Sequence, residues 1–363
     1  SSALAADQNI AATATSKPPL NILFFGNSLT GVNNVPSIVE QIAVAAGKVE
    51  PVVFAQILGG KQLRDHATHG GTNTIITQSL PAGERWDFAV LQEQSYTPSE
   101  VGDPMLFRTY ALVLFDLVRA HSPSATCVLF ENWSRNEGGW PYPPYFKIAD
   151  MQADIRANTA LARDDIDESV GYMRTRIAPI GSAWENNGWN GLHKADRVHA
   201  TPRGSLLAGL VIFRRIYRDD TSDISAADAT ALLSSLGLTV DDWIELTQVA
   251  DRTDELPAPL IHLWVTGNFV PGGDISIWAT GAEGTTAKFW YGFGLLPNPI
   301  FTWKGYWYLQ PPITGPADMG PLPSNNVGSY ETTLPPAPAG PYTVYLQLLS
   351  GDRLTGFFPL HVD

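Results

Sequence analysis

Strand-like and helix-like segments alternate from about Leu20 to Glu255, and this alternation constrains the fold more than any other feature of the chain. It is typical of a parallel β-sheet covered by helices. Strands are expected at residues 21–25, 52–58, 88–92, 126–130 and 176–179, and helices at 36–46, 105–120, 146–162 and 205–217. The fold class predicted for this region is therefore α/β.

The composition changes after Leu256, where Pro, Gly and aromatic residues become frequent. The alternating stretches 274–279, 286–291 and 342–348 indicate antiparallel strands, so an all-β, sandwich-like domain is expected there. Its aromatic residues are expected to pack its core and the contact between domains, with a sugar-stacking platform as the alternative. We expect a flexible N-terminal segment at 1–19, the α/β domain at 20–255 and the β domain at 256–363, since 363 residues favour two domains.

The formal net charge of −13 is spread along the chain, which argues against nucleic acid or an anionic membrane surface as a partner. No apolar run reaches the roughly 18 residues that a membrane span needs, so no membrane insertion is expected. The single cysteine, Cys127, excludes an internal disulfide. Ala3-Leu4-Ala5 resembles the end of a secretory signal peptide and predicts a secreted or periplasmic protein; a flexible arm rich in Ala, Ser and Thr is the competing interpretation.

The sequence NILFFGNSLT, which begins at Asn21, places a serine just after an apolar strand. Gly26 supplies conformational freedom and Asn27 tolerates unusual dihedral angles, so Ser28 can be held rigidly at the carboxyl end of the strand. Open α/β sheets bind ligands at that edge, which makes Ser28 a candidate nucleophile. The alternative is that Ser28 only caps the helix that follows.

Asp196-x-x-His199 lies in a loop that leads into the expected helix 205–217. In one tight turn the Asp196 carboxylate can accept the Nδ1 hydrogen of an imidazole, which leaves His199 Nε2 free to take a proton from a serine hydroxyl. A serine needs such a base, because its hydroxyl is a weak nucleophile at its ordinary pKa. The spacing alone is a weak signal, since Asp and His share many solvated loops, but it gains specificity together with Ser28.

Two further segments follow strands and offer hydrogen-bond donors to a developing oxyanion. Gly59 and Gly60 follow the second strand, where a backbone N–H can approach a substrate without a Cβ in the way. Gln92 follows the third strand, and its side-chain amide can supply another donor. The alternatives are an ordinary turn at the two glycines and a sheet-edge hydrogen bond at Gln92.

Taken together, these blocks resemble the SGNH (GDSL-type) hydrolase superfamily over roughly residues 20–217. The matching blocks are Gly26-Asn27-Ser28-Leu29, Gly59-Gly60, the strand end at Gln92, and Asp196-x-x-His199. The resemblance implies a flavodoxin-like three-layer sandwich with a parallel sheet, in agreement with the alternation described above. It implies these roles: Ser28 as nucleophile, His199 as general base and acid, Asp196 as orienting carboxylate, and Ser28 N–H, Gly60 N–H and one side-chain amide as the oxyanion hole.

The third block departs from the family pattern. Family members usually have Gly-x-Asn-Asp there, whereas this chain has Leu91-Gln92-Glu93-Gln94, which looks more like the carbohydrate acetylesterase branch, where Gln takes the role of Asn. Gln92 is chosen over Gln94 as the oxyanion donor because it lies nearer the end of the strand. The resemblance implies a carboxylic ester hydrolase for short-chain acyl esters, particularly acetyl esters of a polysaccharide.

Residues beside these blocks are candidates for contacting the substrate: Asn27, Gly59, Glu93, Gln94, Trp133 and Trp140. The two tryptophans belong to the segment 131–145, whose aromatic, Gly and Pro residues suit a cleft wall or lid. Aromatic loops can stack on an aromatic acid as well as on a sugar, so a polyester or aryl ester is the second substrate class.

A metal hydrolase is one competing function, because His193-x-x-Asp196-x-x-His199 and His66-x-x-His69 offer nitrogen and oxygen ligands at short spacing. Three ligands spaced by three residues would suit one helix face, but a glycine and a proline mark the first stretch as loop. Serine chemistry needs neither a metal nor another cofactor, so none is expected.

A non-catalytic carbohydrate-binding protein is the other competing function, with the aromatic β domain as the binding module. The intact set of Ser28, Asp196 and His199 argues against it. Glu93 could also act as the acid of a glycosidase, but no partner carboxylate is identifiable from the spacing.

Overall fold

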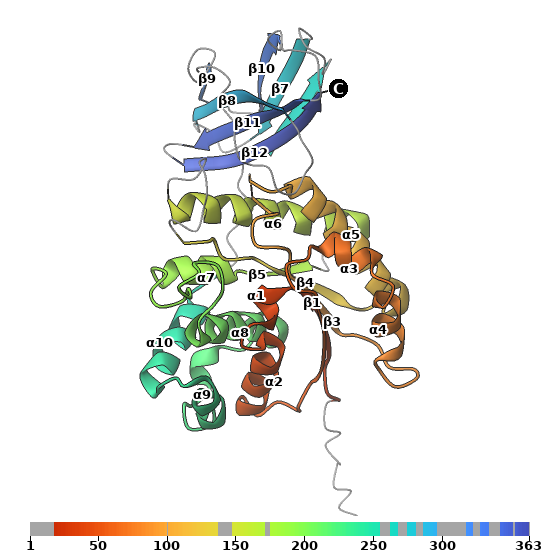
Figure 1. Cartoon of the computed structure of the whole chain (residues 1–363), viewed down its shortest axis with the longest axis vertical. Coiled ribbons are helices and arrows are strands. Elements are labelled where there is room, and N and C mark those ends of the chain that lie inside the picture. The colour runs from red at the N-terminus through yellow and green to blue at the C-terminus, as the bar shows by residue number, and fades with distance from the viewer. Residues whose placement is uncertain are drawn as a thin grey trace, which may run out of the picture.

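The computed structural model describes residues 18–99, 101–136, 147–170 and 175–254 with their side chains, and beyond them the backbone of seven strands between His262 and Val362. Within residues 18–254, five parallel strands form a sheet in the order β2-β1-β3-β4-β5 (Figure 1). Their bounds are Asn21–Gly26 for β1, Val52–Ile57 for β2, Phe88–Leu91 for β3, Thr126–Phe130 for β4 and Thr175–Ala178 for β5. This is the flavodoxin-like strand order, so the predicted α/β class is confirmed.

Strand β1 is buried on both of its faces. Ile22 and Phe24 pack into one hydrophobic core, whereas Leu23 and Phe25 pack into a second core on the opposite face of the sheet. A strand covered on both sides needs a continuous apolar run, not an alternating one. The four apolar residues in a row therefore suit β1 to the interior of a three-layer fold.

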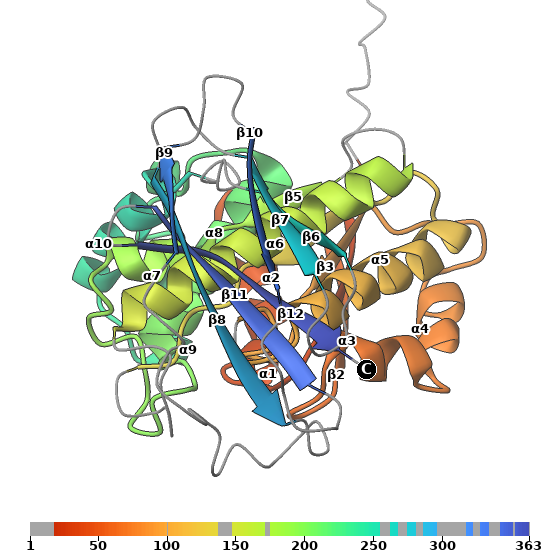
Figure 2. The same ribbon diagram turned by 90° about the horizontal axis from the view of Figure 1, so that it is seen from above.

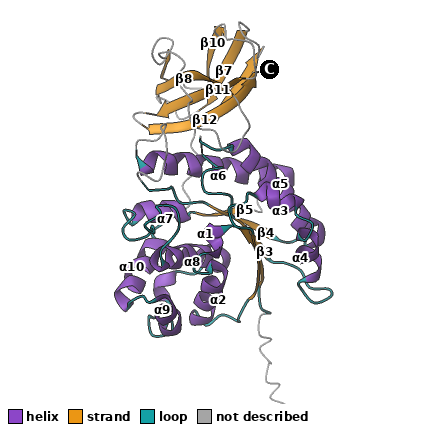
Figure 3. Cartoon of the chain, in the orientation of Figure 1, coloured by secondary structure: helices purple, strands orange, loops and turns teal. Residues whose placement is uncertain are grey.

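Helices form the two outer layers, which Figure 3 shows in purple on either side of the sheet. The helices whose residues join the first core are α2 (Val35–Ala45), α7 (Ile180–Asn186), α8 (Pro202–Tyr217), α9 (Thr230–Leu236) and α10 (Val240–Asp251). Those that join the second core are α3 (Leu63–Thr68), α4 (Thr72–Gln78), α5 (Pro104–His121) and α6 (Ile148–Val170); α5 and α6 run side by side (Figure 2). The two remaining helical segments of the described residues are each a single turn: α1 (Ser28–Gly31) and a 3₁₀ turn at Thr221–Asp223. No described helix is both long and apolar enough to cross a membrane.

Most element bounds lie close to the predicted ones, but α6 is longer than expected. It continues past Ala162 to Val170, because Ile166 still packs into the core among polar neighbours that face outward. The sequence patterns do not predict α3, α4, α7, α9 and α10. Helix α10 had an available signal, since Thr239 and Asp242 form a capping box at its start.

Beyond residue 254 the strands form two antiparallel sheets, in the orders β10-β7-β6 and β12-β11-β8-β9. Their bounds are His262–Gly267 for β6, Asp274–Thr280 for β7, Thr286–Leu295 for β8, Ala317–Pro321 for β9, Val327–Thr333 for β10, Tyr342–Ser350 for β11 and Arg353–Val362 for β12. The expected strands 274–279, 286–291 and 342–348 fall within β7, β8 and β11. The sandwich packing and the domain boundary at 255/256 stay predictions. The aromatic side chains of this region, and residues 1–17, lie outside the described residues.

The strand order places a topological switch point between β1 and β3. The connection from β1 runs through α2 on one face of the sheet to β2, and that from β3 runs through α5 on the other face to β4. Ligands of such sheets bind outside the carboxyl ends of the strands at this point. The predicted site segments at Ser28, Gly60 and Gln92 all follow strands at this edge.

Candidate active site

Ser28 is the first residue of α1, and it does not cap that helix. The cap is Asn27, whose side-chain oxygen accepts a hydrogen bond from Leu29 N–H at 3.0 Å. The Asn27 amide also donates to the carbonyl of Lys61 at 2.8 Å. Asn27 thus takes the capping role that was the alternative for Ser28, and the Ser28 hydroxyl stays available for another partner.

That partner is the imidazole of His199. Ser28 Oγ lies 2.8 Å from His199 Nε2, and His199 Nδ1 lies 2.7 Å from Asp196 Oδ2. The other Asp196 oxygen accepts hydrogen bonds from the backbone N–H groups of Val198 and His199, each at 2.9 Å. Desolvation raises the pKa of Asp196, but these backbone bonds and the bond to the His199 ring outweigh it and lower the pKa to about 2. The structure therefore brings the three predicted residues together, with the carboxylate ionised.

A small hairpin presents His199 to Ser28. His193 and Ala200 form an antiparallel bridge, and Lys194 N–H donates to the carbonyl of His199 at 2.7 Å. Trp133 stabilises this turn, because its indole N–H donates to the carbonyl of Val198 at 2.9 Å. The side chain of His199 therefore projects from a hydrogen-bonded support.

Gln92 does not supply the oxyanion donor that the sequence predicts. Its side chain is only 1% exposed, and its Oε1 accepts from Asn27 N–H at 2.8 Å and from Thr30 Oγ1 at 3.0 Å. Its amide nitrogen donates to the carbonyl of Glu93. The amide is turned into the protein because the Ser28 turn and the strand end both bond to it. In this structure Gln92 holds the turn that carries Ser28, through its bonds to Asn27 and Thr30.

Gln94, the alternative to Gln92, lies half-buried at the same strand end. Its Oε1 accepts from Tyr96 N–H at 3.1 Å and from Thr97 Oγ1 at 3.3 Å, which fixes the amide plane. The amide nitrogen is not used in either bond. Gly60 is exposed on the neighbouring loop with a left-handed φ of +69°, and a Cβ there would meet no atom within 4 Å. Two potential donors, on the loops after β2 and β3, therefore remain after Gln92 is removed from the set.

Three residues predicted to contact the substrate are used inside the protein instead. Asn27, Glu93 and Trp133 are each no more than 2% exposed. Trp133 stacks on Trp184 with ring centroids 4.3 Å apart, so it is core and not a cleft wall. Gly59, like Gly60, is exposed and stays a candidate. Trp140 lies outside the described residues.

The histidines of the two short-spaced motifs make hydrogen bonds within the fold. His193 Nε2 lies 2.8 Å from the carbonyl of Ser134, and His66 is buried with Nε2 3.1 Å from the carbonyl of Gly26. Burial lowers the pKa of His66 to about 4. In the part of the chain that the structure describes, no three His, Cys, Asp or Glu side chains gather as a metal site would require. His66 supports the end of β1 instead.

No family model and no curated protein matches the chain. A candidate SGNH hydrolase from Slackia heliotrinireducens matches with 25% identity and a TM-score of 0.43, over 55% of this chain and 100% of its own. A DUF4886 family protein from Bacteroides uniformis matches with 15% identity and a TM-score of 0.49, over 66% of this chain and 98% of its own. The lipase/acylhydrolase from Enterococcus faecalis matches with 17% identity and a TM-score of 0.41, over 54% of this chain and 95% of its own.

The chain is similar to SGNH-type hydrolases. At these TM-scores the likeness says nothing about individual side chains, so the chemistry of the site rests on the distances given above. The carbohydrate acetylesterase branch, which was suggested by the third block, stays a prediction.

Two polar side chains of the site, the buried Asn132 and the half-buried Asn33, are absent from the sequence prediction. Asn132, which follows β4, donates from its amide to the carbonyls of Glu93 and Gln94 at 2.9 and 3.2 Å. Asn33, which follows α1, donates to the carbonyl of Ala200 at 3.2 Å and so joins the nucleophile segment to the His199 hairpin. A polar residue within two positions of a strand end was the available signal for Asn132. Asn33 had no comparable signal, since its partner is 167 residues away in sequence.

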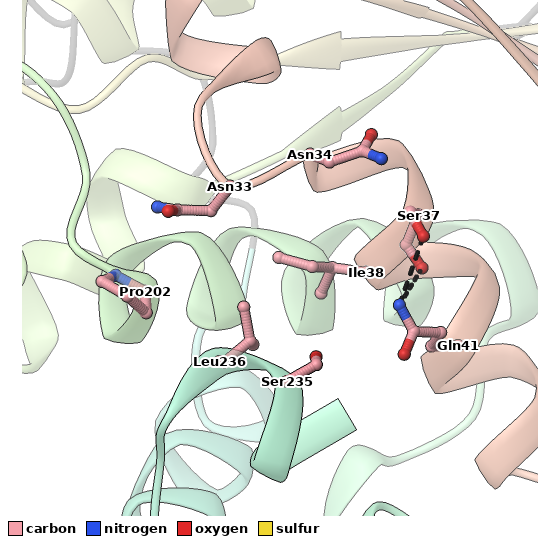
Figure 4. Close-up of a pocket in the computed structure, with 8 residues that line it drawn as sticks. All are labelled: Asn33, Asn34, Ser37, Ile38, Gln41, Pro202, Ser235 and Leu236. Carbon is pink, nitrogen blue, oxygen red and sulfur yellow. Dashed lines mark hydrogen bonds between the residues drawn. The ribbon is translucent and has the colours of Figure 1, made fainter. Parts of the chain in front are cut away.

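A surface pocket lies beside this link, between α2, α9 and the start of α8 (Figure 4). Its lining residues are Asn33, Asn34, Ser37, Ile38, Gln41, Pro202, Ser235 and Leu236. None of them belongs to the Ser28, His199 and Asp196 set. The pocket is therefore separate from the reactive hydroxyl.

Proposed function

We propose that this protein is a serine-dependent carboxylic ester hydrolase that works through an acyl-enzyme intermediate. One observation carries the proposal: hydrogen bonds run without a break from Ser28 Oγ through the His199 ring to the Asp196 carboxylate, at 2.8 and 2.7 Å. Both distances are those of good hydrogen bonds. A nucleophile, a base and an orienting carboxylate in this order are what acyl transfer to a serine requires.

In the first half-reaction, Ser28 Oγ attacks the carbonyl carbon of the ester while His199 Nε2 takes the hydroxyl proton. The carbonyl π electrons move to oxygen and form an oxyanion. Asp196 stabilises the imidazolium through the bond to Nδ1. When the carbonyl re-forms, the bond to the alcohol oxygen breaks and His199 returns its proton to that oxygen, which leaves Ser28 acylated.

In the second half-reaction, a water takes the place of the alcohol. His199 Nε2 removes a proton from the water as its oxygen attacks the acyl carbon, and then protonates Ser28 Oγ as that bond breaks. The products are a carboxylic acid and the free serine. Apart from the ester and the water, neither step needs a metal ion or a cofactor.

The proposed oxyanion donors are Ser28 N–H, Gly60 N–H and the side-chain amide of Gln94. The N–H of a first helical residue has no acceptor within its helix, which suits Ser28 for this role. Gly60 presents backbone without a Cβ on an exposed loop. Gln94 takes the place of Gln92, because the Gln92 amide is already bonded inside the fold.

We propose short-chain acyl esters, in particular acetyl esters of a polysaccharide, as the substrates. The support is the sequence resemblance of the third block together with a net charge of −13, which favours a neutral substrate over a polyanion. Polyester and aryl ester substrates are the second class. This second class has less support, because Trp133, which was expected to line an aromatic cleft, is buried in the core.

The proposal is tested with p-nitrophenyl acetate. Ser28→Ala is expected to lower kcat by at least about 10³-fold, since loss of the nucleophile removes the covalent route. Ser79→Ala, at a half-buried serine after α4, serves as the control and should keep full activity. Hydrolysis should also survive a chelator. Full activity in Ser28→Ala, or loss in chelator with recovery on adding zinc, would contradict the proposal.

Substrate class is tested by comparing p-nitrophenyl acetate, butyrate and octanoate, and by measuring acetate release from acetylated xylan. If short-chain acyl esters are the substrates, kcat/KM should fall as the acyl chain lengthens. Equal or better cleavage of octanoate, or activity on an aromatic polyester without acetate release, would favour the second substrate class.

A further inference from the structure

Glu93 is a buried carboxyl group that the proposed reaction does not use. It lies between Gln92 and Gln94 after β3, and its side chain is 1% exposed. Burial, the largest effect, raises the pKa of Glu93 to about 8, and the charge of Asp65 raises it further, against hydrogen bonds that lower it. Burying a carboxyl group is costly unless its oxygens are hydrogen-bonded, so its contacts indicate what it does.

The two carboxyl oxygens of Glu93 bond to two different loops. Oε1 accepts from the backbone N–H of Gln94 at 2.6 Å, on its own loop. Oε2 accepts from the backbone N–H of Leu63 at 3.2 Å, at the start of α3. These two partners are backbone groups, and the Thr97 side chain also contacts the carboxyl group. The Glu93 side chain therefore fixes the two main chains relative to each other.

The loops that Glu93 joins carry two of the proposed oxyanion donors. Leu63 follows closely on Gly60, and Gln94 bears the side-chain amide. A second bond connects the same loops, since Gln62 Nε2 donates to Thr97 Oγ1 at 3.1 Å. Thr97 Oγ1 in turn donates to Gln94 Oε1, which orients that amide. The bonds to Glu93 and Thr97 therefore set where the Gly60 and Gln94 donors lie.

We propose that Glu93 is a positioning residue for the oxyanion hole: it fixes the distance between the Gly60 N–H and the Gln94 amide. This inference rests on the proposed ester hydrolase function and deepens it. Glu93 touches no reacting atom. It acts through Gln94 and through the loop that carries Gly60, and a shift of either donor is felt mainly in the transition state, where the oxyanion exists.

The first test is Glu93→Gln, which keeps the shape of the side chain but replaces one accepting oxygen with an NH₂ group. One of the two backbone N–H groups then loses its acceptor. We expect kcat for p-nitrophenyl acetate to fall by about 10- to 100-fold with KM changed much less, since small misplacements of catalytic groups cost this much. Glu93→Asp keeps the carboxyl group but is one methylene shorter, and a fall in kcat is expected there too.

Glu131→Gln is the matched control. Glu131 follows β4, is 2% exposed, and its Oε1 accepts from Ser182 N–H at 2.8 Å, from Ser182 Oγ at 2.7 Å and from Gln152 at 3.0 Å. These partners belong to α7 and α6 and not to the oxyanion loops. Glu131→Gln should therefore affect thermal stability more than kcat. Thermal unfolding of all variants gives the folded fraction used to normalise kcat.

The second test is a double-mutant cycle with Gln94→Ala. If Glu93 acts partly through Gln94, Glu93→Gln should lower kcat several-fold less when Gln94 is already absent. A purely structural role would lower kcat by the same factor in both backgrounds. Glu131→Gln should be additive with Gln94→Ala.

The outcomes separate this inference from the function on which it rests. An active wild-type protein that Ser28→Ala inactivates supports the ester hydrolase. Given that result, kcat of Glu93→Gln equal to that of Glu131→Gln overturns the positioning role, as does full additivity with Gln94→Ala. If Glu93→Gln does not fold, Glu93→Asp decides by the same criteria. A wild-type protein without esterase activity overturns both.

Discussion

Gly26 is the residue on which the geometry of the nucleophile turn depends most directly. A Cβ at this position would lie 2.4 Å from Thr30 Oγ1 and 2.9 Å from Gln92 Oε1, so only glycine fits without displacement. The same Gln92 oxygen accepts from the N–H of Asn27, one residue before Ser28. Glycine therefore lets a buried amide reach and hold the turn that carries the hydroxyl.

Gly26→Ala is expected to lower the free energy of unfolding by about 1–3 kcal/mol, the usual cost of overpacking. It should also lower kcat, because Gln92 and Thr30 must move and the Ser28 turn moves with them. Gly70→Ala is the control, since no atom lies within 4 Å of its Cβ position. Denaturant titration and p-nitrophenyl acetate kinetics measure the two effects. A Gly26→Ala protein with normal stability and activity would refute the packing argument.

At the scale of elements, the His199 hairpin depends on a tryptophan pair from the loop after β4 and from α7. Trp133 and Trp184 stack with an interplanar angle of 2°, and both are almost fully buried. Only Trp133 uses its indole N–H in support of the hairpin, by donating to the carbonyl of Val198. Trp184 Nε1 has no hydrogen-bond partner among the described residues. The pair thus provides a matched comparison for one hydrogen bond.

Trp133→Phe and Trp184→Phe remove similar volumes from the same stack, so both should lower stability. Only Trp133→Phe also breaks the bond to Val198, and we expect it to lower kcat by about fivefold more than Trp184→Phe, as roughly 1 kcal/mol would. Kinetics with p-nitrophenyl acetate on folded protein test this. Equal kcat values for the two variants would show that the hairpin does not need the indole bond.

At the scale of the whole molecule, two carboxyl groups give opposite pH dependences of stability. The pKa of Glu93 is raised to about 8 from an ordinary value of 4.5, so between these values the folded state holds a proton that the unfolded state has released. Raising the pH through this range therefore favours unfolding. The pKa of Asp196 is lowered to about 2 from 3.8, so its contribution is present above 3.8 and is lost as the pH falls through 2.

Glu93→Gln, which cannot ionise, should flatten the fall in unfolding free energy between about pH 4.5 and pH 8. Asp65 and Thr97 face this carboxyl group and remain in the variant, so the comparison isolates the titration of Glu93. Urea titrations at several pH values measure the slope for both proteins. The same slope in the variant as in the wild type would show that Glu93 does not titrate in this range.

Much of the α/β region could be predicted, because its signals are local. Apolar runs such as Ile22 to Phe25 identify buried strands, and the turn at Ser28 and the spacing of Asp196 and His199 identify chemistry within a few residues. The choice between Gln92 and Gln94 as oxyanion donor depends on residues that are distant in the sequence. Both carry the same amide after the same strand, and contacts with Asn27 and Thr30 turn one inward.

By itself, the sequence determined the order of the five parallel strands and of helices α2, α5, α6 and α8, and the residue types at the carboxyl edge of the sheet. Only the tertiary structure decided which of those side chains meet. Ser28 and His199 are 171 residues apart in the sequence but share a hydrogen bond. Trp133 is buried in the core, although the composition of its loop predicts a cleft wall. The physical reason is that periodicity assigns a residue to an element, whereas burial and hydrogen-bond direction depend on what other elements bring to the same place.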